Sequence, residues 1–125
     1  IPSTSERRIN VDGKPLPFRA FDLEEIGKAV LAERCDYTLF NSILVGWDNS
    51  ARRGEQGSIF VNGSPRQYQS WLEQAIADTR VRFPPDERLV FIVAWNEWAE
   101  GNHLEPDTRY GMEYLLATKA ALSIG

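Results

Sequence analysis

Residues 89–101 read LVFIVAWNEWAEG and join an apolar run directly to a motif with two glutamates. The run from Leu89 to Trp95 shows no alternation of polar and apolar residues. It therefore predicts a strand buried on both faces, as in a parallel sheet covered by helices. Glu97 and Glu100 then follow the carboxyl end of this strand. Because ligands bind at that end of the strands in barrels and open α/β sheets, the position indicates a functional site.

The spacing of Glu97 and Glu100 suits a carboxylate pair that acts on sugars. In a helical turn over residues 96–101, the two side chains would share a face, with Cβ atoms roughly 5–6 Å apart. Retaining glycosidases place their carboxyl groups about 5–5.5 Å apart, whereas inverting enzymes need roughly 6.5–9.5 Å to admit a water molecule. The spacing thus favours retention. The structural alternative is that both residues lie in the solvated first turn of a helix.

The segment NEWAEGNHLEPD at residues 96–107 resembles the signature of the glycoside hydrolase family 99-like domain. Within that group the chain most resembles the WbsX-type bacterial glycosyltransferases. The resemblance extends to the loop GWDNSARRG at residues 46–54, to the helix around Trp71 and to RYG at residues 109–111. It covers about residues 20–125.

This resemblance implies a (β/α)8 barrel in which Glu97 and Glu100 are the catalytic residues. Characterised hydrolases of the family are endo-acting, retaining α-mannosidases or mannanases. By the same resemblance, Glu97 is the base that assists the sugar 2-hydroxyl, and Glu100 is the general acid and later the base. The chain has Ala99 where the hydrolases commonly carry histidine, and Trp47 and Asp48 where they tend to have tyrosine. These departures favour the WbsX-type branch.

The chain has 125 residues, whereas a complete (β/α)8 barrel takes about 250. We therefore expect an α/β fragment that is the C-terminal part of a TIM-type barrel. Residues 1–20 are interpreted as a polar loop or linker, and residues 21–125 as C-terminal βα units. Two parallel strands with their helices would leave sheet edges open and apolar faces uncovered. Either the remainder of the parent barrel or self-association is expected to cover them.

Capping and turn signals predict the elements along the chain. Asp22 begins a helix that ends near Cys35, and Ser64 with Pro65 begins a second one. Strands are expected at residues 42–46 and 89–95. Residues 57–61 are expected to pair briefly as the arm of a hairpin, and a last helix follows residue 110. The order of strands and helices predicts parallel strands with right-handed connections.

Nine further residues are candidates for substrate binding because they lie at strand ends or within the two motifs: Trp47, Asp48, Asn49, Arg52, Arg53, Asn96, Trp98, His103 and Glu105. Asp48 can bind sugar hydroxyls or cap a helix. Arg52 or Arg53 can clamp the phosphate of a donor or simply be surface charge. Trp98 can form the floor of a sugar subsite or plug the rim of the barrel.

Three of these candidates also have structural alternatives. Asn96 can orient Glu97 or cap a helix, and Glu105 can touch the substrate or brace its loop. His103 can be a polar contact of the site or part of a loop. Because His103 is the only histidine, a multi-histidine metal site is excluded. We expect no metal and no cofactor.

The composition is that of an ordinary globular protein, with 42% hydrophobic and 26% charged residues. The net charge of −4 and the scattered basic residues argue against a nucleic-acid partner. No apolar run is long enough for a transmembrane segment. Cys35 is the only cysteine, which precludes an internal disulfide and fits a reducing compartment. We expect a cytoplasmic location, which includes the inner face of the membrane.

The leading hypothesis is an enzyme that acts on glycosidic bonds. It would be a glycosyltransferase of bacterial surface polysaccharide or lipopolysaccharide biosynthesis, with a saccharide substrate supplied as a nucleotide-linked or lipid-linked sugar. One alternative is a retaining, endo-acting glycoside hydrolase of the family 99-like type. Another is a carbohydrate-binding or assembly module without turnover, and a third is a scaffold surface for protein partners.

Overall fold

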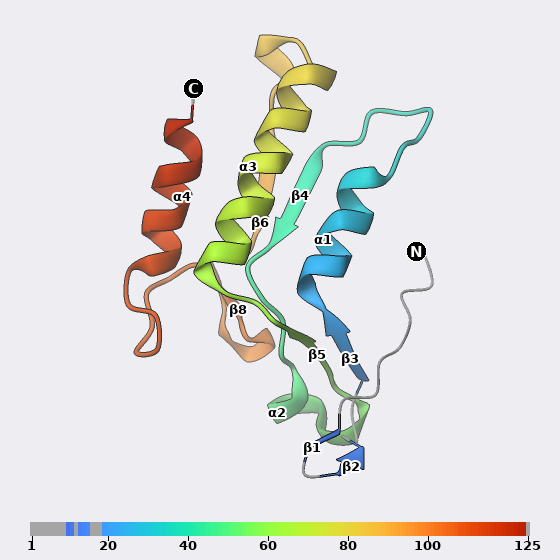
Figure 1. Ribbon diagram of the computed structural model, residues 1–125, viewed down its shortest axis with the longest axis vertical. Helices are drawn as coiled ribbons and strands as arrows, with labels where there is room; N and C mark the ends of the chain where they lie inside the picture. Colours follow the sequence, from blue (N-terminus) through green and yellow to red (C-terminus); the bar gives the residue numbers. More distant parts are fainter. Residues whose placement is uncertain (1–9, 12, 16–18, 125) are drawn as a thin grey trace.

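The computed structural model describes residues 10–11, 13–15 and 19–124, which form a mixed α/β structure (Figure 1). Short 3₁₀ turns, here η1 to η3, connect several of the helices and strands. In chain order the elements are β1 (Asn10–Val11), β2 (Lys14–Pro15), β3 (Arg19–Asp22), α1 (Leu23–Ala32), β4 (Asn41–Leu44), α2 (Ser50–Arg53), η1 (Gly54–Gln56), β5 (Ser58–Val61), α3 (Pro65–Arg82), η2 (Pro85–Glu87), β6 (Val90–Val93), β7 (Asn96–Glu97), η3 (Trp98–Glu100), β8 (Asn102–His103) and α4 (Glu113–Ser123).

The two strands predicted from apolar runs are present, and they pair in parallel as expected. β4 pairs with β6 in a register that places Asn41 opposite Val90. A further bond from the Val45 amide to the Val93 carbonyl, 2.9 Å long, continues the pairing beyond β4. Both strands are shorter than predicted. Parallel strand pairs flanked by helices are compatible with part of an α/β barrel, although the described residues do not close one.

β5 has two partners, of which the sequence predicted one. It forms the expected hairpin arm, because the Phe60 amide donates to the Trp47 carbonyl at 2.8 Å and an antiparallel bridge joins Asp48 to Ile59. It also pairs in parallel with β3, which was not predicted. β3 begins at residue 19, within the predicted lead-in loop of residues 1–20, and β1 pairs with β2 in the same lead-in. Residues 1–9, 12 and 16–18 of the lead-in lie outside the described residues.

Both predicted helix starts are confirmed by their caps. The Asp22 carboxylate accepts hydrogen bonds from the amides of Glu24 and Glu25, at 2.9 and 3.1 Å. The Ser64 hydroxyl accepts one from the Gln67 amide at 3.0 Å. α1 ends at residue 32, slightly earlier than expected, and α4 begins at residue 113. None of the helices in the described ranges is long and apolar enough to cross a membrane.

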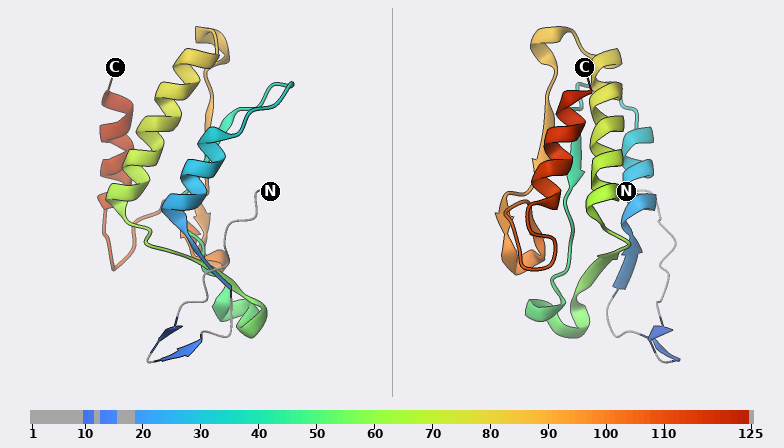
Figure 2. Two further views of the ribbon diagram at one scale, coloured as in Figure 1. Left: turned by 45° about the vertical axis from the view of Figure 1, so that its right-hand side comes forward. Right: turned by 60° about the vertical axis from the view of Figure 1, so that its left-hand side comes forward.

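The helices α1, α3 and α4 form one layer that lies against β4 and β6 (Figures 1 and 2). α3 is the central helix of this layer and packs against both others. Trp71 is buried, as predicted. The core lies between the layers and consists of Leu23, Ile43, Val45, Tyr68, Trp71, Leu72, Ala75, Leu104, Ala117 and Ala121.

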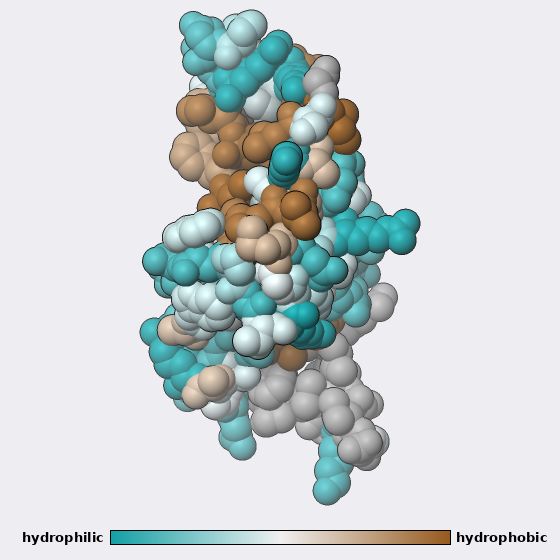
Figure 3. Space-filling view, turned by 90° about the vertical axis from the view of Figure 1, so that its left-hand side faces the viewer, coloured by the Kyte–Doolittle hydropathy of each residue, from teal (hydrophilic) through white to brown (hydrophobic). Residues whose placement is uncertain are grey.

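β6 is covered on one face only, which corrects the expectation of a strand buried on both faces. Val90 and Ile92 pack against the core. Phe91 and Trp95 point the other way and are 52% and 53% exposed. The physical reason is that the helices lie on one side of β6, and no described element covers the other side. Figure 3 shows apolar surface gathered on the side of the molecule where α4 and β6 lie.

Candidate active site

The two motifs singled out in the sequence lie in direct contact. The Asp48 amide donates a hydrogen bond to the Glu100 carbonyl at 2.8 Å. Gly101 has a φ of 55°, and a Cβ atom there would lie 3.0 Å from the Cβ, N and O atoms of Asp48. Gly46 in turn approaches the Gly101 carbonyl, since a Cβ atom at Gly46 would lie 3.2 Å from that oxygen. The GWDN loop after β4 and the NEWAEG motif after β6 thus meet backbone to backbone.

The NEWAEG motif is not the helical turn that the spacing suggested. Asn96 and Glu97 form β7, which pairs antiparallel with Asn102 and His103 in β8. Only residues 98–100 between them are helical, as a single 3₁₀ turn. The pairing of β7 with β8 outweighs the local tendency to start a helix. The first glutamate therefore lies in a strand, and the second ends the turn.

The two glutamates lie in unlike surroundings. The side chain of Glu97 is exposed. The side chain of Glu100 is only 13% exposed, and its Oε1 atom forms an ion pair with the guanidinium of Arg52 on α2. Its Oε2 atom is buried without a hydrogen-bond partner among the described residues. Arg53, the next residue on α2, is exposed.

Asp48 and Asn49 hold the loop that carries the two arginines. The Asp48 carboxylate accepts hydrogen bonds from the amide and hydroxyl of Ser50, at 3.0 and 2.5 Å. Asp48 thus forms a local turn with Ser50 rather than a helix cap, because the N-cap residue of α2 is Asn49. The buried side chain of Asn49 accepts a hydrogen bond from the Ser58 amide at 2.8 Å and so ties the loop to β5. Both residues thereby fix where α2 starts.

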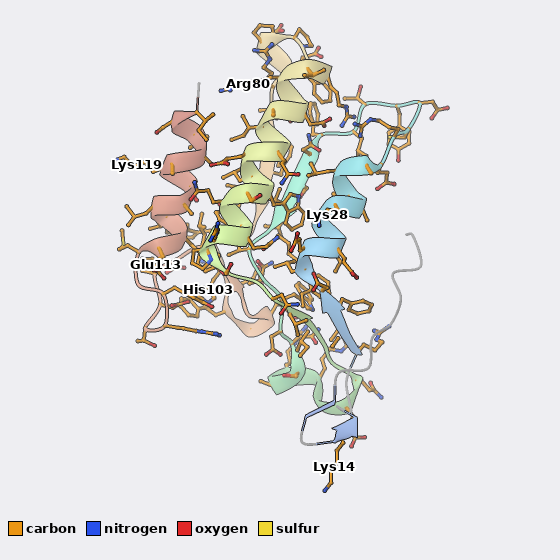
Figure 4. The ribbon with its side chains drawn as sticks, viewed as in Figure 1. Lys14, Lys28, Arg80, His103, Glu113 and Lys119 are labelled. Carbon is orange, nitrogen blue, oxygen red and sulfur yellow. The ribbon has the colours of Figure 1, made fainter. Side chains whose placement is uncertain are left out.

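Trp98 and His103 form an aromatic stack beside the glutamates. Their ring centroids are 3.6 Å apart and the rings are nearly parallel, at 12°. His103, labelled in Figure 4 near the start of α4, lies 3.1 Å through Nδ1 from the Glu105 carbonyl. Its Nε2 atom is 3.7 Å from the Asp107 carboxylate. Trp98 remains 50% exposed, so it presents aromatic surface to solvent.

A cavity of about 500 Å³ opens next to this stack, between the GWDN loop, the end of β5 and the loop before α4. Three predicted residues line it, namely Trp47, Asp48 and His103, whereas neither glutamate does. Tyr114 also lines the cavity, and burial together with the nearby Tyr110 raises the pKa of its hydroxyl to about 12. The phenol therefore remains protonated near neutral pH and can donate a hydrogen bond.

The other predicted contacts are more dispersed. Asn96 lies exposed in β7, so it does not cap a helix. Glu105 is half-buried, and its backbone braces the loop because its amide donates to the Trp95 carbonyl at 3.0 Å. Within the part of the chain that the structure describes, no three His, Cys, Asp or Glu side chains lie close enough to hold a metal ion.

Two residues that support the site were missed in the sequence. Asn102 is fully buried, and its side-chain oxygen accepts a hydrogen bond from the Ala94 amide at 3.1 Å, which fixes the end of β6. The Asp107 carboxylate accepts bonds from the amides of Arg109 and Tyr110, at 2.9 and 2.6 Å. An Asp followed by a turn was a usable signal for the second residue. No local sequence pattern distinguished Asn102.

Comparisons with known proteins identify relatives and a family for this chain. Two curated relatives from strains of Xanthomonas campestris pv. campestris, each called uncharacterized protein WxcX, are 48% identical over 88 residues. The match covers 70% of this chain and 13% of each relative, so the chain spans a small part of their length. No solved structure matches the chain. The family described as Glycosyltransferase WbsX matches residues 3–118. The chain, with its GWDN loop docked on its NEWAEG motif, therefore belongs to the WbsX glycosyltransferase family.

Proposed function

We propose that this chain carries the two reactive carboxylates, Glu97 and Glu100, of a glycosyltransferase that builds bacterial surface polysaccharide or lipopolysaccharide. Membership of the WbsX family supports a function in carbohydrate chemistry. The observation that carries the proposal is the docking of the two motifs, through the Asp48 amide and the Arg52 ion pair with Glu100. These contacts gather charged groups at the carboxyl ends of β4 and β6, where α/β proteins bind their ligands.

The roles of the carboxylates follow the family resemblance. Glu97 assists the sugar 2-hydroxyl, and Glu100 serves as general acid and then as base. A transferase and a retaining hydrolase can share these groups, because they differ in whether an acceptor hydroxyl or water captures the activated sugar. The family description favours transfer. Exposed Arg53 suits the phosphate of a nucleotide-linked or lipid-linked donor.

The saccharide is proposed to bind in the cavity beside the aromatic stack. Its volume of about 500 Å³ falls within the roughly 300–1,000 Å³ of ordinary ligand sites. Trp47 offers an aromatic face for a sugar ring, and Asp48 and His103 offer polar atoms. Trp98, stacked on His103 beside the cavity, is proposed as a further aromatic contact. Asn96 and Glu105 are proposed as further contacts at the rim, whereas Asn49 shapes the loop.

We further propose that the open face of β6 is covered by the remainder of a barrel. β6 pairs only with β4 among the described residues, whereas each strand of a closed barrel has two neighbours. A structure of the full-length protein with another strand bonded to β6 would support this, whereas dimerisation through that face would favour self-association. The cytoplasm, including the inner face of the membrane, is the proposed location.

The experiment that tests the function replaces each glutamate in the full-length protein. Turnover is measured by release of nucleoside diphosphate from nucleotide-linked hexoses, and of nitrophenolate from nitrophenyl glycosides. Glu97→Gln and Glu100→Gln should each lower turnover by about 10²–10⁴-fold, the usual contribution of a general acid or base. Glu87→Gln, an exposed acid on η2, is the matched control and should keep wild-type turnover. Unchanged activity in both active-site variants would refute the assignment.

Assays of the wild-type protein distinguish the alternative functions. Nitrophenolate released to water, without transfer to an acceptor sugar, would favour the hydrolase. Saccharide binding by calorimetry without turnover of any donor in the wild-type protein would favour the binding module. In either case the carboxylates would keep a role in sugar recognition.

A further inference from the structure

The ion pair between Arg52 and Glu100 joins residues of very different exposure. The Glu100 side chain is 13% exposed, whereas that of Arg52 is 57% exposed. Arg52 therefore reaches from the surface of α2 to a carboxylate that is mostly removed from water. Since Oε2 of Glu100 has no hydrogen-bond partner among the described residues, Arg52 is the main compensation for this buried charge.

The energetic consequence follows from the cost of burying a charge. A carboxylate removed from water is strongly unfavourable unless it is paired, and removing one partner of a buried pair is much more costly than losing a surface pair. The pair between Lys28 and Glu24 on α1 is the contrasting case, because both side chains are mostly exposed, at 69% and 61%. Such a surface pair contributes little.

The backbone around the pair gives it a fixed geometry. The Glu100 carbonyl is held by the Asp48 amide, and α2 is held by the side chains of Asp48 and Asn49. Both ends of the ion pair are thus anchored by short hydrogen bonds. Without the guanidinium, nothing would hold the Glu100 side chain inward, and it would be free to turn outward to solvent.

We infer that Arg52 is a positioning residue, which holds the Glu100 carboxylate turned inward beside the GWDN loop. The inference rests on the proposed role of Glu100 in catalysis. It follows that Glu97 is the motif carboxylate open to solvent, whereas Glu100 is held in place by Arg52. Arg52 thereby acts on the reaction through Glu100.

Carboxyl labelling of the full-length protein tests the contact without any substrate. The protein is treated with carbodiimide and glycine ethyl ester, and labelled peptides are quantified by mass spectrometry. Arg52→Gln should raise the labelling rate at Glu100 by about tenfold, because a mostly buried carboxylate loses its partner. Arg52→Lys keeps the charge and should restore slow labelling. Wild-type labelling of Glu100 in Arg52→Gln would overturn the inference.

Two controls make the labelling specific. Arg53→Gln removes the adjacent cation and should leave Glu100 labelling unchanged, as should Lys28→Gln, which removes only a surface pair. An equal rise in Arg53→Gln would overturn the inference. Labelling at Glu73 on α3, which is half-buried and accepts a hydrogen bond from Gln69, reports folding. If it rises in Arg52→Gln, then Arg52→Lys decides the matter: slow labelling of Glu100 supports the inference, and fast labelling overturns it.

Turnover then separates positioning from an independent role. Arg52→Gln should lower kcat by about 10²-fold in the wild-type background and have no further effect in the Glu100→Gln background, because the two residues act as one unit. If the two substitutions lower kcat multiplicatively in the double variant, the inference is overturned. If Glu100→Gln itself leaves turnover unchanged, the proposed function fails, whereas the labelling result still tests the ion pair.

Discussion

Replacement of Gly101 by alanine tests whether the two motifs meet as closely as the structure indicates. Gly101 has a φ of 55°, which costs an alanine about 1–2 kcal/mol. Its Cβ atom would also lie 3.0 Å from three atoms of Asp48, two of them in the backbone. Because backbone atoms cannot move individually, we expect a further loss of about 1–3 kcal/mol from overpacking. The total destabilisation of Gly101→Ala is then about 2–5 kcal/mol.

Gly111→Ala is the matched control for this prediction. Gly111 has almost the same φ, 54°, but nothing lies within 4 Å of the position of its Cβ atom. It should therefore lose only the conformational part, about 1–2 kcal/mol. Urea denaturation, followed by circular dichroism, measures both variants. The midpoint of Gly101→Ala should lie roughly 0.5–1.5 M below that of Gly111→Ala for a typical slope of about 2 kcal/mol/M. Equal midpoints would refute the close approach of the motifs.

Three further predictions concern the scaffold. Gly27→Ala places a Cβ atom 2.9 Å from the Trp71 ring. The cost of overpacking, about 1–3 kcal/mol, should exceed the gain in helix propensity of about 1 kcal/mol, so the variant should be less stable. A higher unfolding temperature than that of the wild-type protein would contradict this packing. The pKa of Asp78 is lowered, because the hydrogen bond from Asn41 and two neighbouring arginines outweigh the opposite effect of burial. The ionised carboxylate therefore stabilises the folded state above the unfolded-state pKa of about 3.9, and this stability is lost as the pH falls through the lower folded-state pKa. In Asp78→Asn, the urea midpoint should consequently fall less steeply with decreasing pH than in the wild-type protein. The pKa of Tyr114 is raised to about 12, chiefly by burial. The protonated phenol therefore contributes folding stability that is fully present below the unfolded-state pKa of about 10 and is lost as the pH rises towards 12. Tyr114→Phe should reduce that alkaline loss, and an unchanged decline would argue against titration of this phenol.

Local signals allowed the helix starts and the main strands to be predicted. Asp22 and Ser64 cap their helices through bonds to amides two or three residues away, so a short window of sequence contains the whole interaction. The apolar runs before Trp47 and Asn96 likewise indicate strands that pair in parallel. Such features depend on residues that are close in the sequence, and for that reason the sequence predicts them.

Features that depend on distant partners were predicted less well. β3, with the sequence RAFD, has no apolar run of the kind that predicts a strand, and it is a strand because β5 pairs with it. The helical turn expected around Glu97 is replaced by pairing with β8. The positions of the two motifs at strand ends indicated that they would lie close together, but they did not indicate which residue would pair with Glu100. The pair with Arg52 depends on how the loop after β4 folds back over the second motif, which no local pattern encodes.

The uncovered face of β6 links the stability of the scaffold to the site. Phe91 and Trp95 are both about half exposed on the strand that leads to Glu97, which is itself exposed. Apolar side chains of this size are stabilised when they are removed from water, so an element that packs against them gains free energy from the contact. An element that extends along this face as far as Trp95 would come within two residues of Glu97 in β7. Such an element would bury Trp95 and at the same time complete the surroundings of Glu97, so that the stability of the strand and the surroundings of this carboxylate would depend on the same contact.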